Sequence, residues 1–94
     1  MSRLYELELI TKGADPDKVK AVFEKVWGVG DTWVGKTTFH IAGKGSLCAG
    51  ESEEEAHERI AILIRKVCRG AKVRTRWTYL EELPFDEFGD AFDE

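Results

Sequence analysis

The local pattern most suggestive of chemistry is the segment Gly30–Thr37, which fits the P-loop pattern Gly-x-x-x-x-Gly-Lys-Ser/Thr. In nucleotide hydrolases this loop wraps phosphates with backbone N–H groups, while its lysine and hydroxyl reach the phosphates and magnesium. Such a loop must follow a buried strand and open a helix. Here the residues that follow, 37–41, are Thr-Thr-Phe-His-Ile, a run typical of a strand. We therefore expect no nucleotide hydrolysis from this segment.

Residues that bind metals or act as nucleophiles are sparse and scattered. The soft ligands His40, Cys48, His57 and Cys68 are separated by 8, 9 and 11 residues, whereas zinc sites favour close pairs. No serine, threonine or cysteine has a general base at a motif spacing. We expect reduced core cysteines, a half-exposed His57 at the side of a helix, no metal, no cofactor and no enzymatic activity.

The C-terminal part of the chain combines acidic residues with phenylalanine. Residues 81–94 hold seven of the 18 acidic residues and none of the 14 basic ones, so this tail carries −7 and residues 1–80 carry +3. Its three phenylalanines fall at positions i, i+3 and i+7, so a helical turn would place them on one edge. We predict that this edge docks in a basic and apolar groove of another protein. The residues predicted to bind the partner are Phe85, Phe88, Phe92, Asp86, Glu87 and Asp90.

A structural role for the same tail is an equal alternative. Pro84 and Gly89 weaken a helix, so the tail can also bind in an extended form. Alternatively, Leu83 and Phe85 prolong the last strand or pack over the protein's own core, and only the final residues are disordered.

A second candidate surface is basic. Residues 72–79 alternate, and Lys72, Arg74 and Arg76 share one side with Thr78. Such a ladder on an open sheet suits nucleic acid, although Glu6 and Glu8 on the first strand would neutralise it. A salt-bridged outer face is the favoured interpretation of the ladder. In the nucleic-acid alternative, the acidic tail masks the basic strand, and deletion of residues 81–94 increases the affinity for single-stranded nucleic acid.

Two helices flanked by strands must position these groups. Residues 4–11 and 72–79 alternate between apolar and polar side chains, which predicts a first and a last strand. Asp15 followed by Pro16 predicts the start of a helix over residues 16–27, with Gly28 after its end. Ser52 with Glu55 forms a capping box, and it predicts a second helix over residues 53–69.

The middle of the chain predicts a hairpin with two competing registers. One places a turn at Gly35-Lys36 between strands near 31–34 and 37–42. The other, which we favour here, has one long strand to Ala42, a turn at residues 43–45 and a short strand through Leu47.

The element order is then strand, helix, strand, strand, helix, strand. It predicts a single-domain α+β protein, a βαββαβ ferredoxin-like sandwich with two helices packed on one face of a four-stranded antiparallel sheet. The first and last strands should be antiparallel neighbours, with Glu6 and Glu8 facing Arg74 and Arg76. Residues 1–80 form the body and residues 81–94 the acidic tail.

This fold serves many unrelated functions, so function must be argued from sites. The chain has 94 residues, 43% of them hydrophobic, with no apolar stretch that spans a membrane and no export signal. We predict a cytoplasmic, non-enzymatic protein-interaction module of the adaptor or inhibitor type, a monomer or weak homodimer, whose protein partner the sequence does not identify. Nucleic-acid binding is the alternative, and a membrane partner is not expected.

Overall fold

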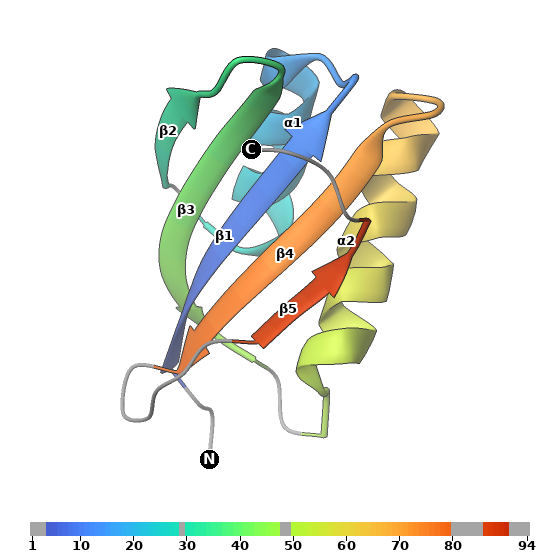
Figure 1. Cartoon of the computed structure of the whole chain (residues 1–94). Coiled ribbons are helices and arrows are strands. Elements are labelled where there is room, and N and C mark those ends of the chain that lie inside the picture. Colours follow the sequence, from blue (N-terminus) through green and yellow to red (C-terminus); the bar gives the residue numbers. More distant parts are fainter. Residues whose placement is uncertain (1–3, 29, 48–49, 80–85, 91–94) are drawn as a thin grey trace.

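The computed structural model describes residues 4–28, 30–47, 50–79 and 86–90, which form two helices and five strands. In chain order they are β1 (Leu4–Lys12), α1 (Pro16–Val26), β2 (Asp31–Val34), β3 (Thr38–Ser46), α2 (Glu53–Val67), β4 (Lys72–Tyr79) and β5 (Asp86–Gly89). The strands form one antiparallel sheet in the order β2-β3-β1-β4-β5. Both helices lie behind the same face of the sheet, which leaves the other face open (Figure 1).

The α+β class is confirmed, and so are the antiparallel sheet and the pairing of β1 with β4. The four-stranded βαββαβ form is wrong, because a fifth strand follows β4. Residues 86–89 from the predicted tail pair with residues 74–77 of β4. An exposed sheet edge presents unpaired N–H and C=O groups, and β5 satisfies those of half of β4.

The hairpin adopts the register that we did not favour. Its turn lies at residues 35–37, where the Gly35 N–H donates to the Thr38 carbonyl at 2.9 Å, and β3 then runs on to Ser46. Gly45 lies within a strand because Trp27 packs against it, and a Cβ there would be 2.7 Å from the indole. The segment that fits the P-loop pattern is thus a hairpin with no helix after its lysine.

The helix starts follow their caps. The Asp15 carboxylate accepts the Asp17 N–H before α1, and Ser52 and Glu55 form the predicted capping box of α2. α2 ends at Val67, two residues earlier than predicted, since the chain turns there through Gly70 with φ +77°. Neither helix is long and apolar enough to cross a membrane, as judged from the described residues.

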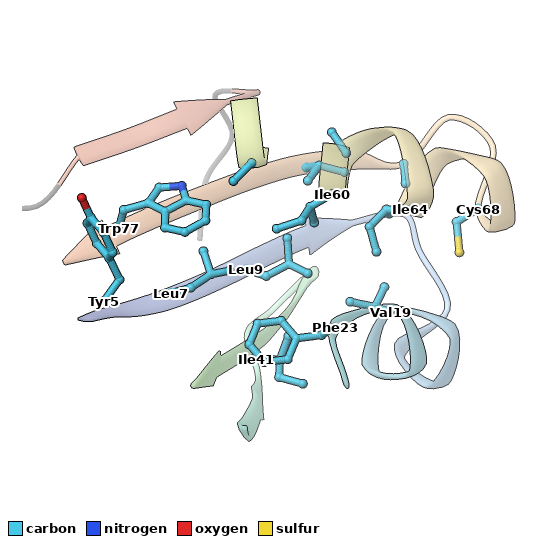
Figure 2. Close-up of a cluster of buried hydrophobic side chains, with 14 of the residues drawn as sticks. Tyr5, Leu7, Leu9, Val19, Phe23, Ile41, Ile60, Ile64, Cys68 and Trp77 are labelled. Atoms are coloured by element: carbon cyan, nitrogen blue, oxygen red, sulfur yellow. The ribbon is translucent and has the colours of Figure 1, made fainter. Parts of the chain in front are cut away.

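The core lies between the helices and the covered face of the sheet. Leu7 and Leu9 of β1 are fully buried against apolar side chains of both helices, including Phe23 and Ile60 (Figure 2). Trp77 of β4 makes edge contacts with Tyr5 and Trp27, with ring centroids 5.9 and 5.5 Å apart. Trp77 therefore joins the sheet to the end of α1.

Candidate functional site

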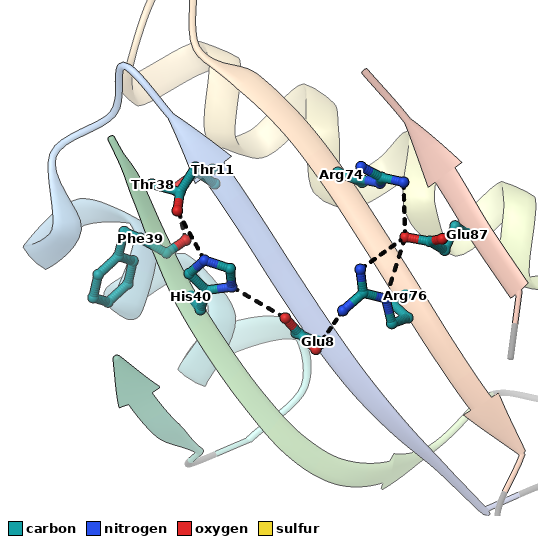
Figure 3. A network of polar contacts seen from close by, with 8 residues as sticks. All are labelled: Glu8, Thr11, Thr38, Phe39, His40, Arg74, Arg76 and Glu87. Atoms are coloured by element: carbon teal, nitrogen blue, oxygen red, sulfur yellow. Dashed lines mark hydrogen bonds and ion pairs between the residues drawn. The ribbon is translucent and has the colours of Figure 1, made fainter. Parts of the chain in front are cut away.

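Charged side chains on the open face form one continuous network (Figure 3). The Glu8 carboxylate accepts from His40 Nδ1 and from Arg76 Nη1, both at 3.1 Å. Because a carboxylate only accepts, His40 Nδ1 is the donor to Glu8, and His40 Nε2 lies 2.8 Å from the Thr38 hydroxyl. On β5, the Glu87 carboxylate lies 3.0 Å from the guanidinium groups of both Arg76 and Arg74. The network runs from β3 to β5 and fixes both arginines.

The two arginines of the expected basic ladder are therefore paired with carboxylates. Glu8 lies opposite Arg76 as predicted, but Glu6 lies opposite Thr78, and Arg74 lies opposite Ile10 and pairs with Glu87. Lys72 is exposed at the start of β4. Binding of nucleic acid by Lys72, Arg74 and Arg76 stays a prediction, in which Glu87 would be the masking group.

β5 attaches part of the predicted tail to the protein itself. Phe88 packs against the core, with its ring 6.1 Å from that of His57 on α2. Asp90 accepts the Val73 N–H and the Arg65 guanidinium, both at 3.0 Å, while Asp86 is exposed. Phe85 and Phe92 lie outside the described residues, so the predicted edge of three phenylalanines is not tested.

Gly89 is required by the close approach of β5 to β4 and α2. Its φ is +107°, a backbone conformation that side chains other than hydrogen disfavour. A Cβ at this position would overlap the Val73 carbonyl oxygen and lie 2.6 Å from Cε1 of His57. The four residues Glu87, Phe88, Gly89 and Asp90 are thus each placed by a different contact.

His57 is a residue whose role the sequence did not show. We expected it half-exposed, and that is wrong: it is 4% exposed, beside Phe88 and Thr75. The Trp77 indole N–H donates to the Thr75 hydroxyl at 2.8 Å, and the hydroxyl lies 2.8 Å from His57 Nδ1. Because the Trp77 contact uses only a lone pair of the Thr75 oxygen, the hydroxyl proton is available to an unprotonated Nδ1, and this geometry is compatible with a neutral His57.

Two groups at the contact between β5, β4 and α2 have shifted pKa values. Burial lowers the pKa of His57 below its usual 6.5, and Arg65 acts in the same direction against the opposing carboxylates of Glu58, Asp90 and Glu54. The hydrogen bond from the Val73 N–H holds the pKa of Asp90 below 3.8, and Arg65 and Lys72 reinforce it. Both groups connect the protonation state of the molecule to the docking of β5.

The stability should consequently fall at acid pH in two windows, one beginning near pH 6.5 and the other near pH 3.8. Below pH 6.5 the unfolded chain protonates His57 before the folded one does, so the free energy of unfolding decreases until the lower folded pKa is reached. Asp90 stabilises the fold above pH 3.8 and loses that contribution only as the pH falls below this value. Urea unfolding measured in small pH steps should show the first decrease in the natural chain and a smaller one in His57→Gln. Equal slopes in the two proteins would contradict the assignment.

No family model, curated protein or solved structure matched this chain in comparisons with all three. Among the described residues, no three His, Cys, Asp or Glu side chains are grouped as metal ligands.

Proposed function

We propose that this protein is a non-enzymatic protein-interaction module that binds an extended segment along the edge of β4. Its own residues 86–90 occupy that edge as an internal ligand. The observation that carries the proposal is that this segment is contacted on both faces of the sheet. Arg74 and Arg76 bind it on the open face, and the core beside His57 contacts it on the covered face.

In strand addition of this kind, the main chain and the side chains of the added segment have different roles. Main-chain hydrogen bonds along an edge supply affinity, and pockets for alternate side chains supply specificity. Successive residues of β5 point to opposite faces, so Glu87 reaches the arginines while Phe88 reaches the core. Gly89 allows the close approach, and Asp90 pairs with Arg65. The recognised pattern is acid, aromatic, glycine, acid.

The internal ligand is built so that it can be exchanged. β5 pairs with residues 74–77 and leaves the other half of β4 without this partner. Its ion pairs lie near the surface, where each contributes about 0–1 kcal/mol. Phe88 is the one apolar anchor among residues 86–90, and it is only partly buried. A partner segment of the same pattern can replace β5, and the displaced tail is then available to a groove on the partner.

We treat the architecture as a ferredoxin-like sandwich extended by one edge strand, and the protein as a cytoplasmic adaptor or inhibitor. Nucleic-acid binding is the second candidate, and the contact of Glu87 with both arginines favours it, since release of β5 would remove that carboxylate from Arg74 and Arg76. Glu6 and Glu8 would remain on the same strand face and oppose phosphate.

The proposal predicts that the detached segment binds in trans. The full chain with Gly89→Val, in which valine obstructs docking, is titrated with a peptide of residues 84–94 carrying the natural sequence. Amide resonances of residues 73–77 should shift toward their positions in the unaltered protein, with saturation. A peptide with alanine at position 88 and glutamine at position 87 is the matched control and should bind at least about tenfold more weakly.

Equal shifts with both peptides, or none with either, would contradict recognition by the β4 edge. Titration of the same variant with an oligouridine separates the second candidate. Salt-dependent shifts at Lys72, Arg74 and Arg76 with oligouridine, and none with the peptide, would favour nucleic-acid binding instead.

A further inference from the structure

A groove lies at the opposite edge of the sheet, where β2 pairs with β3 on the open face. Its volume is about 460 Å³, within the range of small-ligand sites. It is lined by Glu6, Gly30, Asp31, Trp33, Ala42, Gly43 and Lys44. It shares no lining residue with β4 or β5, so it is a different site from the one proposed above.

Strand register explains why the groove exists. Ala42 lies between Asp31 on β2 and Glu8 on β1, and its small methyl group forms the floor of the groove. Larger side chains of the neighbouring rows form the walls: Trp33 on one side, and the opposed pair Lys44 and Glu6 on the other.

The aromatic wall is held firmly in place. Trp33 stacks on His40 with ring centroids 5.2 Å apart and an interplanar angle of 17°. His40 is itself fixed by Thr38 and Glu8, as described above. Trp33 nevertheless remains 44% exposed. An exposed, pre-oriented indole is a surface on which a planar or cationic group can stack.

The charges around this indole contrast with those of the neighbouring network. The Glu8 carboxylate has two partners, whereas the side chains of Glu6, Asp31 and Lys44 make no ion pair or hydrogen bond within the part of the chain that the structure describes. All three are exposed on the groove wall. Two carboxylates against one ammonium leave a net negative charge beside the indole.

We infer that this groove binds an arginine side chain from an extended segment of a partner protein lying along β2. Guanidinium is planar, stacks on aromatic faces and bonds carboxylates in a bidentate manner, so Trp33 and Asp31 match both of its properties. β2 is an edge strand, and all four of its residues are exposed, so an incoming strand has access to it.

The test uses the full natural chain and the probe acetyl-Thr-Thr-Arg-Thr-Thr-amide. The Trp33 indole N–H resonance, assigned with Trp33→Phe, should shift with saturation, together with the amides of Asp31 and Lys44. The same peptide with citrulline, which keeps the shape and removes the charge, should bind at least about tenfold more weakly. No saturable shift with the arginine peptide, or equal binding of the citrulline peptide, overturns the inference.

Two variants locate the site, and one serves as a control. Asp31→Asn removes a wall charge and Ala42→Leu fills the floor, so each should abolish the shift at Trp33. Lys12→Gln alters a charge on the same face outside the groove and should leave it unchanged. If the shift persists in Asp31→Asn, which tests the site even where Ala42→Leu fails to fold, the inference is wrong. Cytidine monophosphate is the competing probe, and binding of it without binding of the arginine peptide also overturns the inference.

Discussion

Replacing Gly89 with valine is expected to detach β5 while the rest of the sheet stays folded. The new Cβ meets the Val73 carbonyl oxygen and the His57 ring, and the backbone at φ +107° disfavours any side chain there. The left-handed conformation alone costs roughly 1–2 kcal/mol for an L-residue, and the collision adds to it. The ion pairs of β5 are too weak to compensate. Amide resonances of residues 86–90 should therefore lose their dispersion, and those of residues 73–77 should move.

A matched glycine separates collision from backbone strain. Gly70 has φ +77°, and a Cβ there meets nothing within 4 Å. Gly70→Val should therefore carry a comparable conformational cost and leave β5 in place. If the two variants lose stability equally and both keep the β5 resonances, the close packing of Gly89 does not control docking.

The sequence predicted the starts of the helices better than the structure of the tail, and the difference is physical. A capping box or a proline after an aspartate is satisfied by residues next to it in the chain, so Ser52 and Asp15 specify their helix starts locally. The tail depends on a distant edge. Its phenylalanine spacing fits one face of a helix, but β4 presents unpaired backbone groups that an extended strand satisfies.

Glycine misled the hairpin prediction for a related reason. Gly43 and Gly45 are equally typical of a turn and of a strand that another chain segment approaches closely. The second explanation holds, because the Trp27 indole packs on Gly45 and donates its N–H to the Gly43 carbonyl at 2.8 Å. The residues next to Gly43 in the sequence do not indicate its contact with Trp27, which is 16 residues away.

The two candidate surfaces followed the sequence to different degrees. Alternation in residues 72–79 placed Arg74 and Arg76 on the open face, and pairing of one of them with Glu8 followed from the expected order of strands. The partnership of Trp33 with His40 required the correct register of β2, which the sequence left open. Alternation along a strand predicts which face of the sheet a side chain occupies. A site that spans two strands also depends on the register, which decides the residues that lie opposite each other.

Trp77→Ala is expected to be the most damaging single substitution, and it links the core to the proposed binding edge. Trp77 is 1% exposed, packs edge-on against Tyr5 and Trp27, and donates to Thr75, which in turn contacts His57. Truncating a buried tryptophan costs about 3–5 kcal/mol, a large part of the stability of a small domain.

Urea unfolding of Trp77→Ala, Trp77→Phe and Trp33→Ala separates the contributions to this loss of unfolding free energy. Trp33→Ala, which removes an exposed indole, should change the free energy of unfolding by about 1 kcal/mol or less. Trp77→Phe keeps an aromatic ring but lacks the N–H donor to Thr75, so its loss should lie between those of Trp33→Ala and Trp77→Ala. A loss in Trp77→Ala no greater than in Trp33→Ala would contradict the central role of Trp77. Movement of the residue 86–90 resonances in Trp77→Phe would show that the buried indole of Trp77 also positions β5.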